Sequence, residues 1–126
     1  MKKYNYQSGK NGEEIARTYL IKKGYKHIES NFRTRFGEID LIFSKDNKLI
    51  FVEVKLKIGD QFGTPEEMIN KRKVLQVTKT AQMYLIQNQK IENSHKGYQI
   101  DAVCIVQNED GSIARISHYE NVGSEL

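Results

Sequence analysis

Two apolar segments joined by a short polar turn constrain the fold more than any other feature of this sequence. The first runs from Glu38 to Phe43 and the second from Leu49 to Lys57, and the Asp46-Asn47 pair between them suits a turn. Side chains alternate between the two faces of a strand. In both segments one face is wholly apolar, and the other is apolar near the turn. Exposed edge strands are not normally apolar on both faces, so we expect a central antiparallel hairpin inside a covered sheet.

Carboxylates interrupt one face of this hairpin at a single end. If Ser44 pairs with Leu49, the register predicts further cross-strand pairs: Ile42 with Phe51, Asp40 with Glu53, and Glu38 with Lys55. The opposite face is then expected to be wholly apolar, and carries Ile39, Leu41, Phe43, Ile50, Val52, Val54 and Leu56. A slip of one residue would send Asp40 and Glu53 to opposite faces, each into hydrocarbon, so the pattern specifies the register more strongly than the turn alone.

Two carboxylates that face each other across a pair of strands repel, because their Cβ atoms lie only about 5 Å apart. Lys55 can neutralise part of this charge from the same face of the strand. A divalent cation can neutralise more, and hard oxygen ligands suit Mg²⁺ or Mn²⁺. The alternative is a structural charge cluster, in which Lys55 and Arg35 bridge Asp40 and Glu53 at a frayed sheet edge.

The remaining segments complete a single series of elements. A helix is expected at about residues 8–23, ended by Gly24, and a weak strand at 25–33. The residues Thr64 to Glu67 resemble a capping box that opens a long helix reaching about Gln89. Its inner face is predicted to hold Val74, Val77, Ala81, Tyr84 and Leu85. Two further strands, residues 98–107 and 113–119, give an α/β fold in the order α-β-β-β-α-β-β, a mixed central sheet flanked by helices.

Composition limits the classes of protein that this chain can represent. Its 126 residues suit one domain, 1–126. Cys104 is the only cysteine, which excludes an internal disulfide and a cysteine-built zinc site. No segment approaches the roughly 20 apolar residues that span a bilayer, so we expect no membrane partner and a cytoplasmic location. The net charge of +4 makes a polyanion a reasonable partner, and whether the chain is a monomer or a homodimer stays open.

Several blocks of this sequence together resemble the YraN-type family. They are Gly12-Glu13 with Ala16 and Tyr19-Leu20, "KKGY" (22–25), "NFRTRFGEIDLI" (31–42), "FVEVK" (51–55), "FGTPEE" (62–67), and Lys73 before "AQMYL" (81–85). The resemblance covers residues 8–106, and the paired GEIDLI and FVEVK blocks are specific in combination. That family is placed among the restriction-endonuclease-like, or PD-(D/E)xK, nucleases, close to archaeal Holliday-junction resolvases.

The resemblance implies a fold and a set of catalytic residues. The superfamily's motif maps onto Asp40, Glu53 and Lys55, with the helix glutamate at Glu13. The metal, Mg²⁺ or Mn²⁺, would then be held by Asp40, Glu53 and the backbone carbonyl of Val54. Two positions depart from the pattern. Ile39 stands where the superfamily name has proline, and Lys57 stands where we expect arginine, which can grip a phosphate through two parallel hydrogen bonds.

Helix geometry bears independently on Glu13. It lies almost in line with Leu20 at the rim of the apolar face, whereas Glu14 is turned about 100° further toward solvent. A first-turn acid favoured by the helix dipole is an equal alternative.

Basic residues near the acids are candidates for contacting nucleic acid. Arg33, Arg35, Lys57 and Lys73 are the predicted set. The histidines, His27, His95 and His118, are expected to be ordinary surface residues, and Asp101 to support the end of the sheet without chemistry of its own.

These observations favour a metal-dependent nuclease that hydrolyses phosphodiester bonds in nucleic acid, with DNA as the expected substrate and branched DNA among the candidates. Lys55 would orient the attacking water. A nucleic-acid-binding or scaffold module of the same fold without turnover is the alternative, and a partner-binding protein that uses no nucleic acid is a third. The sequence does not distinguish DNA from RNA or branched from linear substrates.

Overall fold

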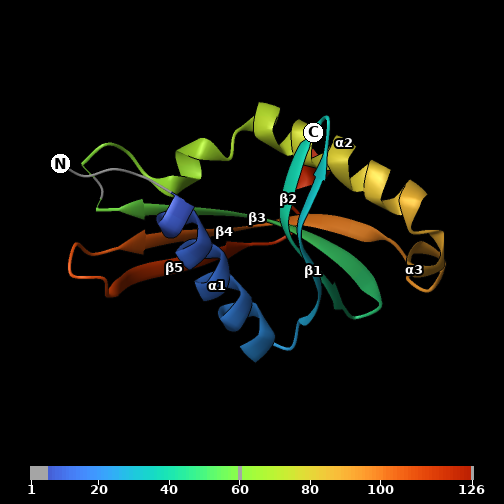
Figure 1. Cartoon of the computed structure of the whole chain (residues 1–126), viewed down its shortest axis with the longest axis horizontal. Helices are drawn as coiled ribbons and strands as arrows, with labels where there is room; N and C mark the ends of the chain where they lie inside the picture. The colour runs from blue at the N-terminus through green and yellow to red at the C-terminus, as the bar shows by residue number, and fades with distance from the viewer. Residues whose placement is uncertain (1–5, 60, 126) are drawn as a thin grey trace.

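The computed structural model describes residues 6–59 and 61–125 and contains a five-stranded sheet in the order β1-β2-β3-β4-β5 (Figure 1). The strands are β1 (Lys26–Thr34), β2 (Gly37–Lys45), β3 (Lys48–Ile58), β4 (Tyr98–Gln107) and β5 (Ile113–Tyr119). The helices are α1 (Tyr6–Lys22), α2 (Lys71–Gln87) and α3 (Gln89–Asn93), with short 3-10 turns η1 (Pro65–Met68) and η2 (Val122–Glu125). The α-β-β-β-α-β-β order is confirmed. Within the described ranges, no helix combines the length and the apolar character needed to cross a membrane.

The sheet is mixed. Pairs β1/β2, β2/β3 and β4/β5 are antiparallel, whereas β3 and β4 run parallel. Parallel neighbours cannot be joined by a tight turn, and the connection through α2 and α3 supplies the crossover. β3 and β4 therefore lie at the centre of the sheet, and the β1–β2 hairpin forms one side of it.

Each face of the sheet packs against one helix. On the α1 face the core contains Ala16, Leu20, Tyr25, Leu41, Phe43, Ile50, Val52, Val54, Val103 and Ile105. On the α2 face it contains Ile39, Ile42, Leu49, Phe51, Val77, Ala81, Tyr84, Leu85 and Ile100. The inner face predicted for the second helix is confirmed, since all five of its residues are buried. Covering both faces explains why β2 and β3 are apolar on both sides.

The predicted register of the central hairpin is right near the turn and wrong at the acids. Ser44 pairs with Leu49 and Ile42 with Phe51, but the ladder between β2 and β3 ends at Leu41↔Val52. The expected pairs of Asp40 with Glu53 and of Glu38 with Lys55 are therefore absent from the described register.

Beyond this point β2 continues only with β1, and two-stranded ribbons twist more strongly than wide sheets. The twist also moves one apolar side chain. Ile39 was expected beside Leu41 and Phe43, yet it packs in the α2 core with Ile42. Figure 1 shows the β1–β2 hairpin rising past α2.

The predicted start of the second helix is also wrong. Thr64 precedes η1 but its side chain makes no capping hydrogen bond, and the α-helix begins only at Lys71. There Asn70 is the N-cap, and its Oδ1 accepts a hydrogen bond from the N–H of Lys73 at 2.9 Å. The short turn η1, which lies between Thr64 and Asn70, is bound to β5 and does not extend the helix, because Arg115 donates two hydrogen bonds to the Glu66 carboxylate.

Substitution of the two possible caps should separate these assignments. Asn70→Ala is expected to lower the free energy of unfolding by about 1 kcal/mol, the usual cost of losing an N-cap side chain. Thr64→Ala should change it by much less, since the hydroxyl caps nothing. Urea denaturation followed by circular dichroism measures both. A larger loss in Thr64→Ala would contradict the cap assigned here.

Candidate functional site

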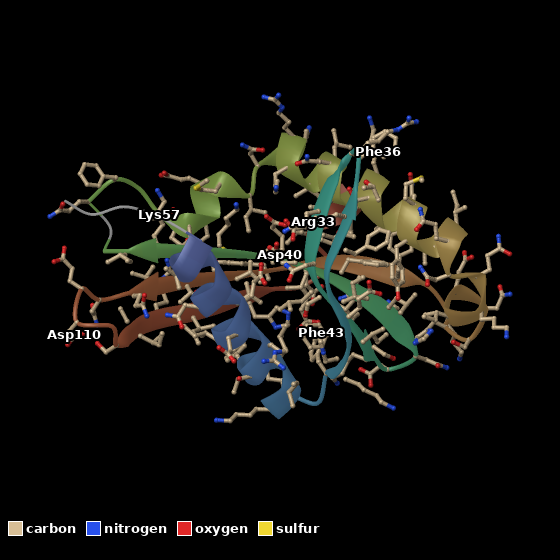
Figure 2. All side chains as sticks on the ribbon, in the orientation of Figure 1. Arg33, Phe36, Asp40, Phe43, Lys57 and Asp110 are labelled. Carbon is tan, nitrogen blue, oxygen red and sulfur yellow. The ribbon has the colours of Figure 1, made fainter. Side chains whose placement is uncertain are left out.

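Asp40 lies where β2 separates from β3, at the centre of the molecule (Figure 2). Its Oδ2 accepts a hydrogen bond from the backbone N–H of Val54 at 2.8 Å. The side chain thus fills the gap that opens after the last backbone pair, Leu41↔Val52. At Val54 the structure shows a hydrogen bond from the backbone N–H to Asp40. The sequence analysis predicted a different role for this residue, with its backbone carbonyl as a metal ligand.

Glu53 lies beside Asp40 and is almost fully buried, with 3 % of its surface exposed. Its Oε2 lies 3.5 Å from Nζ of Lys73 and 3.7 Å from Nζ of Lys55. Its Oε1 has no hydrogen-bond donor among the residues that the structure describes. A buried carboxylate oxygen without a donor is costly, so this atom is the least satisfied feature of the site.

A second set of acids surrounds the other side of Asp40. One carboxylate oxygen each from Glu13 on α1, Glu38 on β2 and Asp40 lie within 4.8 Å of one another. Asn31 joins two of them, since its Nδ2 donates to Glu38 Oε2 at 2.9 Å and to Glu13 Oε1 at 3.1 Å. The four acids therefore form one continuous cluster, with Asp40 between Glu53 and the Glu13–Glu38 pair.

Glu38 was not among the predicted site residues, and Asn31 is the residue of this cluster that the sequence prediction missed altogether. It adopts a φ of 56° inside β1, between Ser30 and Phe32, which pair with Leu41 and Ile39. Asparagine tolerates this left-handed conformation better than most residues. An asparagine in the middle of a strand was the available signal, although it does not reveal which acids the amide would contact.

The sequence matches the profile of the uncharacterised protein family UPF0102 over residues 12–105, a span that contains the whole acid cluster. The chain belongs to the UPF0102 family. The UPF0102 protein of Caldanaerobacter subterraneus is 38 % identical over 125 residues, which cover 96 % of this chain and 98 % of the relative. That of Persephonella marina is 41 % identical over 105 residues, covering 83 % and 88 %. That of Syntrophomonas wolfei is 49 % identical over 81 residues, covering 64 % and 70 %.

Burial and mutual repulsion dominate the electrostatics of this UPF0102 site. Burial, and next the charge of Glu53, raise the pKa of Asp40 well above its ordinary value, against the hydrogen bond from Val54. Burial also raises the pKa of Glu53, while Lys73 and Lys55 oppose the shift. The burial of these two carboxylates therefore favours their protonated forms.

The pH dependence of stability should report this repulsion. An acid whose pKa is raised in the folded state binds a proton that the unfolded chain lacks, over the range between the two pKa values. As pH falls through the raised pKa of Asp40 toward the ordinary value of an aspartate, the metal-free protein should therefore gain stability from this residue. The Glu66 carboxylate, whose pKa Arg115 lowers to about 2, loses its contribution only at lower pH. Urea denaturation in the presence of a chelator measures the free energy of unfolding at each pH. This free energy should depend less on pH in Asp40→Asn than in wild type, and equal slopes would contradict the raised pKa assigned to Asp40.

The predicted nucleic-acid-binding residues are not all brought together. Arg33 lies on β1 opposite Glu38, with Nε 3.3 Å from Glu38 Oε2, and its side chain is 72 % exposed. Arg35 is at the hairpin tip, where its guanidinium carbon lies 5.2 Å from the centre of the Phe36 ring. Lys73 contacts Glu53 directly and thus belongs to the acid cluster. Lys57 lies near the C-terminal end of β3, three residues beyond the Val54 that bonds to Asp40, and Figure 2 shows it to one side of Asp40.

The prediction that His118 is a surface residue is wrong. Its side chain is 2 % exposed, and its Nε2 lies 2.8 Å from Oδ2 of the fully buried Asp101. Asp101 also accepts hydrogen bonds from Gln99 and from the backbone N–H of Asn121, so its role at the sheet end is structural. His27 contacts Ser30 and His95 contacts Ser44, both outside the acid cluster.

Proposed function

We propose that this UPF0102 protein is a metal-dependent nuclease of the PD-(D/E)xK type, which hydrolyses phosphodiester bonds in DNA with Mg²⁺ or Mn²⁺. The observation that carries the proposal is Glu53. It is a buried carboxylate beside a second acid, Asp40, with one lysine two residues along the same strand, and one of its oxygens has no donor within residues 6–59 and 61–125. Buried carboxylate oxygens without a donor are rare in native proteins, and a bound cation is one partner that would account for this one.

The chemistry of these side chains fits a divalent cation. Asp40 and Glu53 would hold it, together with the Val54 carbonyl, and Glu13 and Glu38 add carboxylates on the far side of Asp40. Mg²⁺ takes one or two carboxylates and keeps waters and phosphate oxygens as its other ligands. A cation bound there would stabilise negative charge on the phosphate and help to activate the attacking water.

Lys55 contributes what the carboxylates cannot. Its ammonium has three donors and no acceptor, so it cannot bind a cation directly. Held 3.7 Å from Glu53 Oε2, it can orient a water molecule and stabilise the charge that develops on the phosphate. Lys73 holds Glu53 from the helix side at 3.5 Å, and so helps to position this carboxylate.

The test is a cleavage panel of linear, flapped and four-way-junction DNA, with an RNA of matched sequence, in Mg²⁺ or Mn²⁺. Wild type is expected to cut at least one DNA substrate, and a chelator or Asp40→Asn should abolish the cutting. Failure to cut any substrate in either metal would contradict the nuclease proposal.

A nucleic-acid-binding module without turnover is the second candidate, and one observation favours it. Glu53 Oε2 is already paired with two lysines, and Asn31 already bridges Glu13 and Glu38. Such internal partners could hold the acids in place without a metal. Salt-sensitive binding of DNA without cleavage of any substrate would support this candidate.

A further inference from the structure

A groove lies beside the acid cluster, between α2 and the tip of the β1–β2 hairpin. Its volume is about 640 Å³, and its lining includes Lys55 of β3 and Lys73 of α2. The other residues that line it are Phe36, Met68, Asn70, Arg72, Leu75, Gln76 and Lys79. The groove thus shares two lysines with the site described above and extends away from it along α2.

The groove is basic. Arg72, Gln76 and Lys79 follow one another at spacings of four and three residues, which places them on one stripe of α2. Arg72 and Lys79 are exposed, about 10 Å apart along the helix, and pair with no carboxylate among the described residues. None of the described lining residues is acidic. This charge suits a chain of phosphates.

The groove also exposes apolar side chains that a phosphate backbone would not cover. Phe36 is 38 % exposed, and Met68 and Leu75 are exposed near it. The guanidinium carbon of Arg35 lies 5.2 Å from the centre of the Phe36 ring. The backbone at Phe36 is held in place, because Gln76 Nε2 donates a hydrogen bond to its carbonyl oxygen at 2.8 Å. Gly37 permits this contact, since a Cβ there would lie 2.7 Å from Gln76 Nε2. An exposed aromatic ring beside cations that have no carboxylate partner among the described residues is the arrangement on which the bases of single strands stack.

We propose that this groove binds an unpaired DNA strand, with a base stacked on Phe36 and phosphates held by Arg72 and Lys79. In a duplex the bases are stacked on one another and their faces are closed to the ring, so the groove prefers single-stranded to paired DNA. The inference rests on the proposed function and narrows its substrate class to DNA with an unpaired segment next to the cut phosphodiester.

The test measures binding in a chelator, so that cleavage plays no part. A labelled oligothymidylate is compared with a duplex of equal length by fluorescence anisotropy. Wild type should bind the single strand about tenfold more tightly than the duplex, and Phe36→Leu should remove about tenfold of that affinity. Phe36→Tyr should restore it. A strand containing 2-aminopurine should be quenched by wild type and by Phe36→Tyr, and not by Phe36→Leu.

The phosphate contacts have their own measurement. The double variant Arg72→Gln/Lys79→Gln should reduce the slope of log affinity against log salt by about 1.4, because each contact with a single strand contributes about 0.7. Two controls lie outside the groove. Tyr98→Leu removes an aromatic ring that is 36 % exposed, and Lys90→Gln removes an exposed lysine of α3. Both should bind as wild type does.

Equal affinity for duplex and single strand, or unchanged binding by Phe36→Leu, would overturn the inference. The protein could still cleave DNA in that case, so the nuclease proposal would stand without the groove inference. Conversely, single-strand binding that depends on Phe36, without cleavage of any substrate, would support the groove and contradict the nuclease. Wild type that binds no strand would overturn the groove assignment.

Discussion

Lys55→Met is expected to fold and to bind metal and DNA, yet to lose cleavage by on the order of a hundredfold or more, the usual effect of removing one preorganised electrostatic group. Methionine keeps most of the length and bulk of the side chain and deletes only the ammonium. In the structure this ammonium faces Glu53 Oε2 at 3.7 Å. Single-turnover cleavage at saturating enzyme measures the chemical step separately from binding.

Lys48→Met is the matched control for this prediction. Lys48 is an exposed lysine at the start of the same strand, where it pairs with Lys45 at the turn. Its removal lowers the net charge equally and should leave cleavage unchanged. If Lys55→Met cleaves as fast as wild type, the mechanism assigned to Lys55 is wrong even if the nuclease activity is real.

Glu53→Gln is expected to weaken metal binding and cleavage together. The amide has nearly the shape of the carboxylate, but it carries no charge and presents one oxygen in place of two. A bound cation supplies several kcal/mol to phosphate chemistry, and each 1.4 kcal/mol is tenfold in rate, so we expect a loss of about a thousandfold. Raising the Mn²⁺ concentration should recover part of the rate.

Glu14→Gln provides the comparison for Glu53→Gln. Glu14 follows Glu13 on α1, but its side chain is 70 % exposed and pairs with Arg17. The Glu14→Gln variant loses one negative charge, as Glu53→Gln does, but outside the acid cluster. It should therefore cleave DNA as fast as wild type does. Glu53→Gln that cleaves normally at low Mn²⁺ would exclude this carboxylate as a ligand.

The elements of the fold were largely predictable because their signals are local. The alternation of apolar residues gave the bounds of β4 and β5, and the period of 3.6 gave the buried face of α2. The helix start was mispredicted because two capping signals compete within seven residues. Thr64 has the better local pattern, yet Glu66 is held by Arg115 of β5, a contact 49 residues away in sequence.

The geometry of the site was less predictable because it depends on tertiary contacts. Sequence reasoning placed Asp40 opposite Glu53, but β2 pairs with β3 only from Leu41 to Lys45. The hairpin instead packs on α2 through Phe32 and Tyr84, whose ring centres lie 5.0 Å apart. The burial of His118 could have been predicted, since it lies two residues after Ile116, which packs against the α1 core.

The most direct test of the metal site is the effect of Mn²⁺ on the melting temperature of wild type and Asp40→Asn. A ligand at 100 times its Kd stabilises the folded state by about 2.7 kcal/mol. For a chain of 126 residues this corresponds to a rise in Tm of about 10 °C. We expect wild type to show this concentration-dependent rise and Asp40→Asn to lose most of it. No rise in wild type, or an equal rise in both proteins, would contradict a cation site built on Asp40.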